Sequence, residues 1–274
     1  MEVEPFNEPI DFCVLIPVYN NEEGLNQSLE SIHYPSGAFL VVIVDDGSVQ
    51  PVTRERLSPQ SKKLPLHIIR APVNKGITDA LNTGLKWICA YTTAPYIARL
   101  DCSDQCAADR FVEQVAFLDA HPSVGLLGSW CRFEDKASGQ AFTYKTPLED
   151  GPIRKAMHVR NVFIHPTVMF RTTLVQQAEL YPLDYPHAED YALFWRMLQL
   201  ADGAIIGKPL LIAALNSKGI SASNRRIQLK SCQKVIARFG ASAHLKRLGI
   251  AFASLRLWVP QKLILRFKSW KEQR

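Results

Sequence analysis

Polar side chains follow three short apolar runs in the first 104 residues. VVIVDDGS (41–48) leads from four apolar residues into Asp45 and Asp46, and YIARLDCSD (96–104) leads into Asp101 and Asp104. PVYN (17–20) follows a third apolar run, 12–16. Carboxylates in such positions can accept hydrogen bonds from a base or ribose, or hold a hard divalent cation through oxygen. That cation could bind a diphosphate and neutralise the charge that develops as the diphosphate leaves.

The elements that must position these residues read as strands alternating with helices. Apolar runs at 12–16, 40–44, 66–69, 96–100 and 124–127 are typical of buried strands, and helical spacing occurs at 76–91 and 110–120. Asn20 or Asn21 can cap a helix that begins near Glu22. This order predicts an α/β fold with a mostly parallel sheet covered on both sides.

Ligands of such a sheet bind beyond the carboxyl ends of its strands, so we expect the three polar stretches along one edge. We expect that edge to be wet, with hydrogen-bond donors of a ligand or a cation balancing its carboxylates. The alternative is that these residues only cap helices and form turns. The chain has neither GxGxxG in a βα turn nor GxxxxGK[ST], which excludes a dinucleotide or P-loop reading.

The pattern changes after residue 130. Residues 130–147 predict irregular or hairpin structure, 167–170 a short strand, 188–200 a helix and 205–215 one or two strands. The helix at 188–200 opens on HAEDY, in which Glu189 and Asp190 favour the helix N-terminus electrostatically. Asp190 is also a candidate general base if it reaches the same pocket.

Charge is unevenly distributed along the 274 residues, whose net charge is +6. Residues 230–274 contain eleven Lys or Arg and one acid, a net of +10, whereas the rest has 21 basic and 25 acidic residues, a net of −4. The basicity is therefore local and does not indicate a nucleic-acid-binding protein. The acidic first ten residues do not resemble a secretory signal, and six scattered cysteines are typical of reduced thiols in the cytosol.

Six blocks in order resemble inverting glycosyltransferases of family 2, which have the GT-A fold. They are VLIPVYNNEEGLNQSLESI (14–32), VVIVDDGS (41–48), NKGITDALNTGL (74–85), YIARLDCSD (96–104), HPTVMFRTTL (165–174) and AEDYALFWRML (188–198). The resemblance covers residues 11–215. It implies a GT-A domain over 1–222, with a nucleotide-sugar half at about 11–104 and an acceptor half at about 105–222, followed by a basic helical tail at 223–274.

The resemblance also implies roles for individual residues. Asp190 would be the catalytic base, and Asp101 and Asp104 would hold Mg²⁺ or Mn²⁺. His165, Glu189, Trp195 and Lys218 would contact the acceptor or support the site, although Trp195 is more readily structural. The nucleotide-binding positions would be Pro17, Tyr19, Asn20, Asp45, Asp46, Asn74, Lys75, Gly76, Arg99 and Asp101.

Two positions depart from the family pattern. The family usually reads D-x-D-D, whereas this chain has Asp101-Cys102-Ser103-Asp104, and a serine brings no charge to a cation. After the last core strand, Lys218 stands where many relatives carry arginine and histidine. These departures leave two hypotheses open. One is a transferase moving a sugar from a nucleotide sugar to a glycan or glycolipid hydroxyl in surface polysaccharide or oligosaccharide synthesis. The other is a non-catalytic nucleotide-sugar-binding scaffold in a glycan-assembly complex.

The basic tail mixes Leu, Ile, Phe and Trp with Lys and Arg over residues 242–270, and Pro260 is expected to break it into two helices. It fits either helices packed on the core or an interfacial helix on an anionic membrane. The second reading predicts a cytoplasmic protein peripheral to the inner face of the cell membrane. A sugar-phosphate nucleotidyltransferase shares the α/β layout, but it needs a glycine-rich phosphate loop where this chain has PVYNNEEG.

Overall fold

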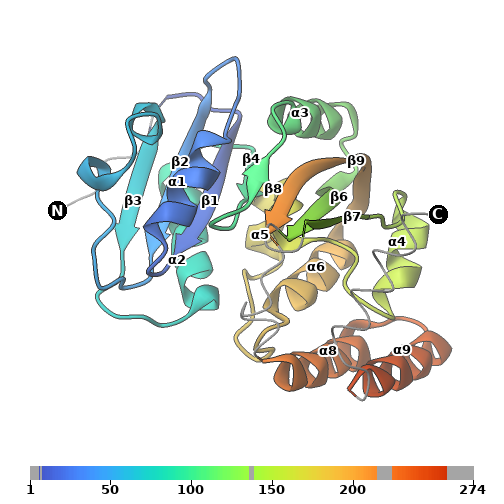
Figure 1. Ribbon diagram of the computed structural model, residues 1–274. Coiled ribbons are helices and arrows are strands. Elements are labelled where there is room, and N and C mark those ends of the chain that lie inside the picture. The colour runs from blue at the N-terminus through green and yellow to red at the C-terminus, as the bar shows by residue number, and fades with distance from the viewer. Residues whose placement is uncertain (1–5, 7, 136–138, 215–223, 258–274) are drawn as a thin grey trace.

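The computed structural model describes residues 6, 8–135, 139–214 and 224–257, and its centre is one nine-stranded sheet (Figure 1). The strand order is β3-β2-β1-β4-β8-β6-β9-β5, with β7 paired to β6. The strands are β1 (Phe12–Val18), β2 (Phe39–Asp45), β3 (Leu66–Arg70), β4 (Tyr96–Arg99), β5 (Gln105–Cys106), β6 (Val124–Asp135), β7 (Gln140–Tyr144), β8 (Met169–Arg171) and β9 (Asp202–Ala214).

The sheet is parallel in its first four strands and mixed beyond them. β1 pairs in parallel with both β2 and β4, and β2 with β3. β8 then enters antiparallel between β4 and β6, while β6 and β9 are parallel. The expected parallel sheet is therefore confirmed for β1 to β4. The expected strand at 124–127 continues to Asp135 and forms a hairpin with β7, which bears out the hairpin reading of 130–147.

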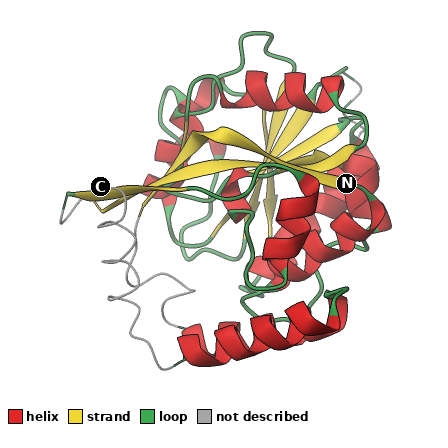
Figure 2. Ribbon diagram, turned by 90° about the vertical axis from the view of Figure 1, so that its right-hand side faces the viewer, coloured by secondary structure: helices red, strands yellow, loops and turns green. Residues whose placement is uncertain are grey.

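Helices cover both faces of the sheet (Figure 2). They are α1 (Glu22–Glu30), α2 (Ile77–Tyr91), α3 (Arg110–Ala120), α4 (Asp150–Met157), α5 (Thr172–Gln177), α6 (Glu189–Leu200), α8 (Arg225–Phe239) and α9 (Ala243–Arg256). Asn21 caps α1 by accepting a hydrogen bond from the Gly24 N–H at 3.1 Å, as expected for one of the two asparagines.

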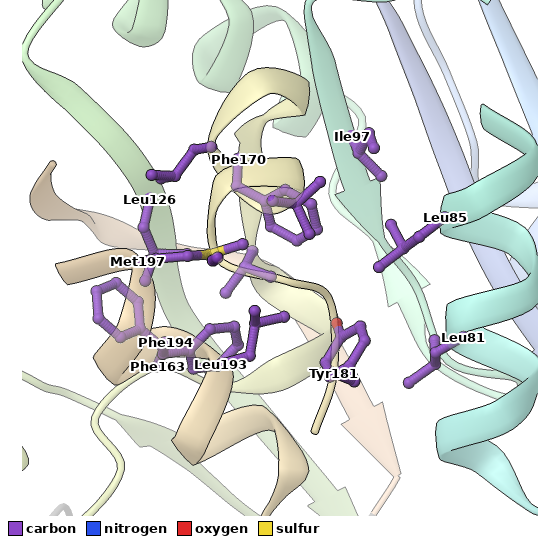
Figure 3. Packing of buried hydrophobic residues seen from close by; sticks show 14 of the residues in the cluster. Leu81, Leu85, Ile97, Leu126, Phe163, Phe170, Tyr181, Leu193, Phe194 and Met197 are labelled. Atoms are coloured by element: carbon purple, nitrogen blue, oxygen red, sulfur yellow. The ribbon is translucent and has the colours of Figure 1, made fainter. Parts of the chain in front are cut away.

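Alternate residues of each central strand feed two separate cores. In β1, Cys13 and Leu15 pack on the side of α2 and α6, whereas Val14 and Ile16 pack on the side of α1 and α3. Since successive side chains point to opposite faces, an unbroken apolar run is what a doubly covered strand requires. Figure 3 shows the first core, in which side chains of α2, β4, β8 and α6 meet and Tyr181 lies among them.

The C-terminal part described here is a helical hairpin. α8 and α9 lie together beside α6 and α4 (Figure 1). Val235 and Ile236 of α8 enter the first core, so this hairpin packs against the sheet and its helices rather than standing apart from them. No helix within the described ranges is long and apolar enough to cross a membrane. Pro260 and the expected second helix of the tail lie outside the described residues.

Candidate active site

The strand ends that carry the polar residues lie along one edge, as expected. Val18 at the end of β1 is the register partner of Asp45 at the end of β2, and Leu15 is the partner of Arg99 at the end of β4. Asn20 links the first two ends, because its N–H donates to Ser48 Oγ at 2.9 Å and its Oδ1 accepts from the Val49 N–H at 2.8 Å. Tyr19 is 49% exposed at this edge, so its ring is free to stack on a base.

Asp45 is sealed inside the protein. Its side chain has no exposed surface, and it accepts hydrogen bonds from the N–H groups of Ser48 and Val52 at 2.9 and 3.1 Å. Arg70 completes the set with Nη1 2.8 Å from Asp45 Oδ2, while 40% of the arginine side chain stays exposed. The expectation of a wet edge is wrong at this residue: donors from the protein itself balance the charge.

Asp46 organises the segment that follows β3. Its two oxygens accept hydrogen bonds from the backbone N–H groups of Lys75 and Gly76 at 2.9 and 2.8 Å, and it is 4% exposed. Gly47, at φ +72°, passes so close that a Cβ there would lie 2.6 Å from the Asn74 nitrogen. DDGS and NKG, 30 residues apart, are thus one loop pair, which brings the expected nucleotide-binding residues together. Their contact with a nucleotide remains a prediction.

Arg99 is a fully buried guanidinium that reaches Asp101. Nη2 lies 2.6 Å from Asp101 Oδ1, Nε donates to His165 Nε2 at 3.3 Å, and Nη1 donates to the Leu15 carbonyl. Because Arg99 can only donate, His165 Nε2 must accept, which places the ring hydrogen on Nδ1. Burial, followed by the charge of Arg99, lowers the pKa of His165 to about 3, so the ring is neutral.

Tyr181 extends this network toward α2. Its hydroxyl lies 2.7 Å from His165 Nε2. Its backbone is held at both ends by Asn82 of α2, whose Nδ2 donates to the Tyr181 carbonyl at 2.8 Å and whose Oδ1 accepts from its N–H at 2.9 Å. The chain of contacts from Asn82 to Asp101 therefore joins the expected nucleotide and acceptor halves.

The expected metal motif presents two carboxylates of different character. Asp101 keeps 33% of its side chain exposed. Asp104 is 9% exposed, and burial, followed by the charge of Asp101, raises its pKa to about 8. Ser103 turns toward α1, where its Oγ accepts from Asn21 Nδ2 at 3.3 Å. No group of three metal-binding His, Cys, Asp or Glu side chains forms among the described residues. A cation at Asp101 and Asp104 therefore remains a prediction, and it would need its other ligands from a diphosphate and water.

Glu189 and Asp190 open α6, as expected. Asp190 accepts from its neighbour's N–H (Tyr191) at 2.7 Å and from Asn161 Nδ2 at 2.9 Å. Burial, followed by the charge of Glu189, raises the pKa of Asp190 to about 7, and the charge of Asp101 adds to this effect. Burial also raises the pKa of Glu189, whose Oε2 is buried without a hydrogen-bond partner. Asp190 and Asp101 thus share one electrostatic environment, and Asp190 is poised to exchange a proton near neutral pH.

Backbone strain gathers at this same region. Within the described ranges, the non-glycine residues with positive φ are Asn20, Ser103, Glu179, Leu180 and His187. Each lies in a segment that positions a site residue: Tyr19, Asp101 and Asp104, Tyr181, or Glu189. Left-handed conformations of non-glycine residues cost free energy and often occur where a site is held in place by its surroundings.

One expected residue, Trp195, does not join this cluster. Trp195 is 3% exposed and packs its ring against His158 at 5.1 Å, which agrees with the structural reading. Lys218 lies outside the described residues. Four residues that sequence reasoning missed do join the site or support it: Arg70, Asn82, Asn161 and Tyr181. Asn82 lies inside the block NKGITDALNTGL, and Asn161 precedes HPTV by four residues, but neither stands out by type or spacing.

The sheet and its acidic edge define an α/β protein with a candidate general base, and comparison with known proteins gives the family. A sequence model described as "Glycosyl transferase family 2" matches residues 13–177. The amylovoran biosynthesis glycosyltransferase AmsE of Erwinia amylovora is 34% identical over 192 residues, which are 69% of this chain and 70% of AmsE. The chain therefore belongs to glycosyltransferase family 2 and is a transferase.

Solved structures confirm the GT-A fold. Staphylococcus aureus TarS in complex with UDP superposes with a TM-score of 0.66 at 19% identity, covering 92% of this chain and 73% of that one. The mannosyltransferase PcManGT of Pyrobaculum calidifontis, in complex with GDP-Man and Mn²⁺, superposes with a TM-score of 0.64 at 19% identity and covers 97% and 75% of the two chains.

Proposed function

We propose that this protein is an inverting glycosyltransferase that moves a sugar from a nucleoside-diphosphate sugar to a hydroxyl of a glycan or glycolipid, in surface polysaccharide or oligosaccharide synthesis. The observation that carries the proposal is Asp190, a carboxyl with a pKa of about 7 in the same electrostatic cluster as the edge carboxylate Asp101. Neighbours crystallised with UDP, UDP-GlcNAc or GDP-Man support a nucleotide-sugar donor, and the relative named for amylovoran biosynthesis supports a polysaccharide product.

The proposed reaction uses the two sides of the site in turn. The nucleoside lies at the edge formed by Tyr19 and the DDGS–NKG loop pair, and the diphosphate lies toward Asp101. Asp190 accepts the proton of the acceptor hydroxyl, the oxygen attacks the anomeric carbon, and the nucleoside diphosphate leaves from the opposite face with inversion. A base with a pKa near the working pH is ionised often enough to act and basic enough to take the proton.

A divalent cation, Mg²⁺ or Mn²⁺, would be held by Asp101 and Asp104 and would supply charge neutralisation for the departing diphosphate. Arg99 would support metal binding by Asp101, because its fully buried guanidinium holds Asp101 Oδ1 in place. Holding one oxygen orients the carboxylate, and part of the Asp101 side chain stays exposed to solvent.

The test of the transferase proposal is a panel of nucleotide sugars with Mn²⁺ or Mg²⁺, first by thermal shift and then by release of nucleoside diphosphate in the presence of glycan and glycolipid acceptors. The expected result is that one donor raises the unfolding midpoint and that its nucleotide is released faster when acceptor is added. The anomeric configuration of the product, determined by NMR, should be opposite to that of the donor sugar. Binding of a nucleotide sugar without transfer to any acceptor would favour the scaffold hypothesis.

The C-terminal hairpin supports a membrane partner. α9 faces inward with Gly249 and Ala253 and outward with Leu248, Phe252 and Leu255, which are 52%, 47% and 65% exposed. This is the reverse of an ordinary surface helix, whose large apolar residues face the core. Residues 224–257 have no Asp or Glu and eight basic residues: Arg225, Arg226, Lys230, Lys234, Arg238, Lys246, Arg247 and Arg256. An apolar stripe with basic flanks matches an anionic lipid surface, and we propose that the protein is peripheral to the cytoplasmic face of the cell membrane.

The membrane proposal is tested by cosedimentation with liposomes rich in phosphatidylglycerol. The double variant Leu248→Asp and Phe252→Asp should lose most binding, because it places two charges in the apolar stripe. Leu200→Asp is the matched control, since Leu200 is 53% exposed at the end of α6 and outside the stripe. Equal binding by the double variant and the wild-type protein would refute the assignment of this stripe.

A further inference from the structure

Asn161 is the one side-chain donor to Asp190 among the described residues. Its Nδ2 lies 2.9 Å from Asp190 Oδ2, and the other oxygen of Asp190 accepts from the Tyr191 N–H at 2.7 Å. The orientation of the Asn161 amide follows from a second contact. The Phe163 N–H donates to Asn161 Oδ1 at 3.2 Å, and an N–H can only donate, so the nitrogen of the amide must face Asp190.

Hydrogen bonds from two neighbouring elements hold the residues just before Asn161. Tyr191 of α6 donates its hydroxyl to the Met157 carbonyl. His158 Nδ1 lies 2.8 Å from the Arg154 carbonyl, and His158 Nε2 accepts from the N–H groups of Ala241 and Ser242 at 3.0 and 3.3 Å. These contacts tie residues 157 and 158 to α6 and to the turn between α8 and α9. Asn161 therefore meets Asp190 from a fixed backbone, which is what a positioning residue needs.

The other groups around Asp190 mostly oppose its ionisation. Glu189 and Asp101 repel its charge. Among the described residues, Asp190 also interacts with Tyr181 from the loop before α6, with Tyr191 of α6 and with Cys232 of α8. Burial acts in the same direction as the two carboxylates. The donors that favour the charged form are the Tyr191 N–H and Asn161 Nδ2.

We propose that Asn161 is a positioning residue of the transfer reaction, which holds one oxygen of Asp190 by a hydrogen bond and so keeps that carboxylate ionised and oriented toward the acceptor hydroxyl. The Tyr191 N–H holds the first oxygen and Asn161 holds the second, so two donors of the protein set the plane of the carboxylate, whichever donor sugar or metal binds. The inference rests on the proposed role of Asp190 as the base and adds a residue to that role.

The prediction concerns the titration of a single carboxyl group. In Asn161→Ala the pKa of Asp190 should rise by about one unit, because a hydrogen bond to a buried charged group contributes roughly that much. In Asn161→Asp the rise should be larger, since a second carboxyl would face Asp190 while its oxygen still accepts from the Phe163 N–H. The order expected for the pKa of Asp190 is thus wild type, then Asn161→Ala, then Asn161→Asp.

The measurement is ¹³C NMR titration of protein labelled at the aspartate carboxyl carbon, with the Asp190 signal assigned by its absence in Asp190→Asn. It needs no acceptor and no metal. Asn26→Ala is the matched control, because the Asn26 amide also joins a backbone N–H and a backbone carbonyl, those of Ser58 and Glu22, but lies on α1. The control should leave the Asp190 titration unchanged.

The pH dependence of kcat gives a second test once an acceptor has been identified. The acid limb of kcat should move to higher pH in both Asn161 variants, and activity should recover toward wild type at alkaline pH. A residue that only holds the loop together would lower kcat equally at every pH. An unchanged Asp190 titration in both folded variants would overturn the inference and leave the role of Asp190 intact. Full turnover by Asp190→Asn would instead remove the proposed base, whatever the Asn161 variants show.

Discussion

Two pairs of adjacent acids, Asp45–Asp46 and Glu189–Asp190, have opposite surroundings in the folded protein. Asp45 and Asp46 end β2 with 0% and 4% exposure, and five donors from the protein satisfy them. Glu189 and Asp190 begin α6, where two hydrogen-bond donors reach Asp190 and Glu189 Oε2 is buried without a partner. The first pair stabilises the folded loops, and the second keeps unsatisfied charge where chemistry can use it.

The largest effect on folding is expected at the first pair. Asp45→Ala would leave the N–H groups of Ser48 and Val52 and one guanidinium without their acceptor. We expect the free energy of unfolding to fall by about 3 kcal/mol, because each buried donor left unpaired costs about 1–3 kcal/mol and Arg70 can still reach water. Urea denaturation followed by circular dichroism measures this. Glu189→Gln, the matched change in the other pair, should stay within about 1 kcal/mol of wild type, and equal losses in both variants would remove the contrast.

The next largest effect is expected at Asp101, and it tests whether this carboxylate acts through a metal ion. Asp101→Asn should weaken the binding of nucleoside diphosphate at least about tenfold in the presence of Mn²⁺, because it removes a charged metal ligand. Without the metal the affinity should change little. Isothermal titration calorimetry with and without Mn²⁺ separates the two contributions. If the loss is the same in both conditions, Asp101 acts on the nucleotide directly and not through a cation.

The smallest expected effect is a shift in pH dependence at Glu189. Its charge helps raise the pKa of Asp190 to about 7, so Glu189→Gln should move the acid limb of kcat to lower pH by about half a unit. The sign is opposite to that predicted for Asn161→Ala. Rate profiles between pH 5 and 9, with buffer and ionic strength held constant, measure the shift. A move to higher pH would mean that Glu189 donates to Asp190 instead of repelling it.

Stability and turnover should respond to pH in opposite directions through Asp190. Its pKa is raised from 3.8 to about 7, so between these values the folded protein holds a proton that the unfolded chain releases. Acidification through this window therefore increases the contribution of Asp190 to the free energy of unfolding, whereas the base form needed for transfer declines.

Much of this contrast was visible in the sequence, because its causes are local. An apolar run that ends in acids predicts a strand end, and the register of β1, β2 and β4 places these ends together. Asn21 and the start of α1 follow from capping chemistry, and α3 begins and ends where helical spacing predicts. The insertion of β8 between β4 and β6 was not predicted, because nothing within a short strand of three residues specifies its neighbours.

The partners of the acids could not be predicted for the same reason. Arg70 is 25 residues from Asp45, Asn161 is 29 residues from Asp190, and Asn82 is 99 residues from Tyr181. An arginine at a strand end or an asparagine in a loop is ordinary, and only the folded chain selects which acid it meets. The expectation of a wet edge around Asp45 was wrong for the same reason. The sequence does not show that three donors of the protein will surround this carboxylate, so a buried Asp45 cannot be told from an exposed one.

The central claim is that Asp190 is the base, and Asp190→Asn tests it most directly. The variant keeps the shape of the side chain but cannot accept a proton at neutral pH. The account predicts a loss of kcat of about 10³-fold, within the range usual for general base catalysis, with calorimetric affinity for the donor nucleotide unchanged. Asp202→Asn, half-exposed at the start of β9, should have wild-type turnover. Full turnover by Asp190→Asn at pH 7 would contradict the account.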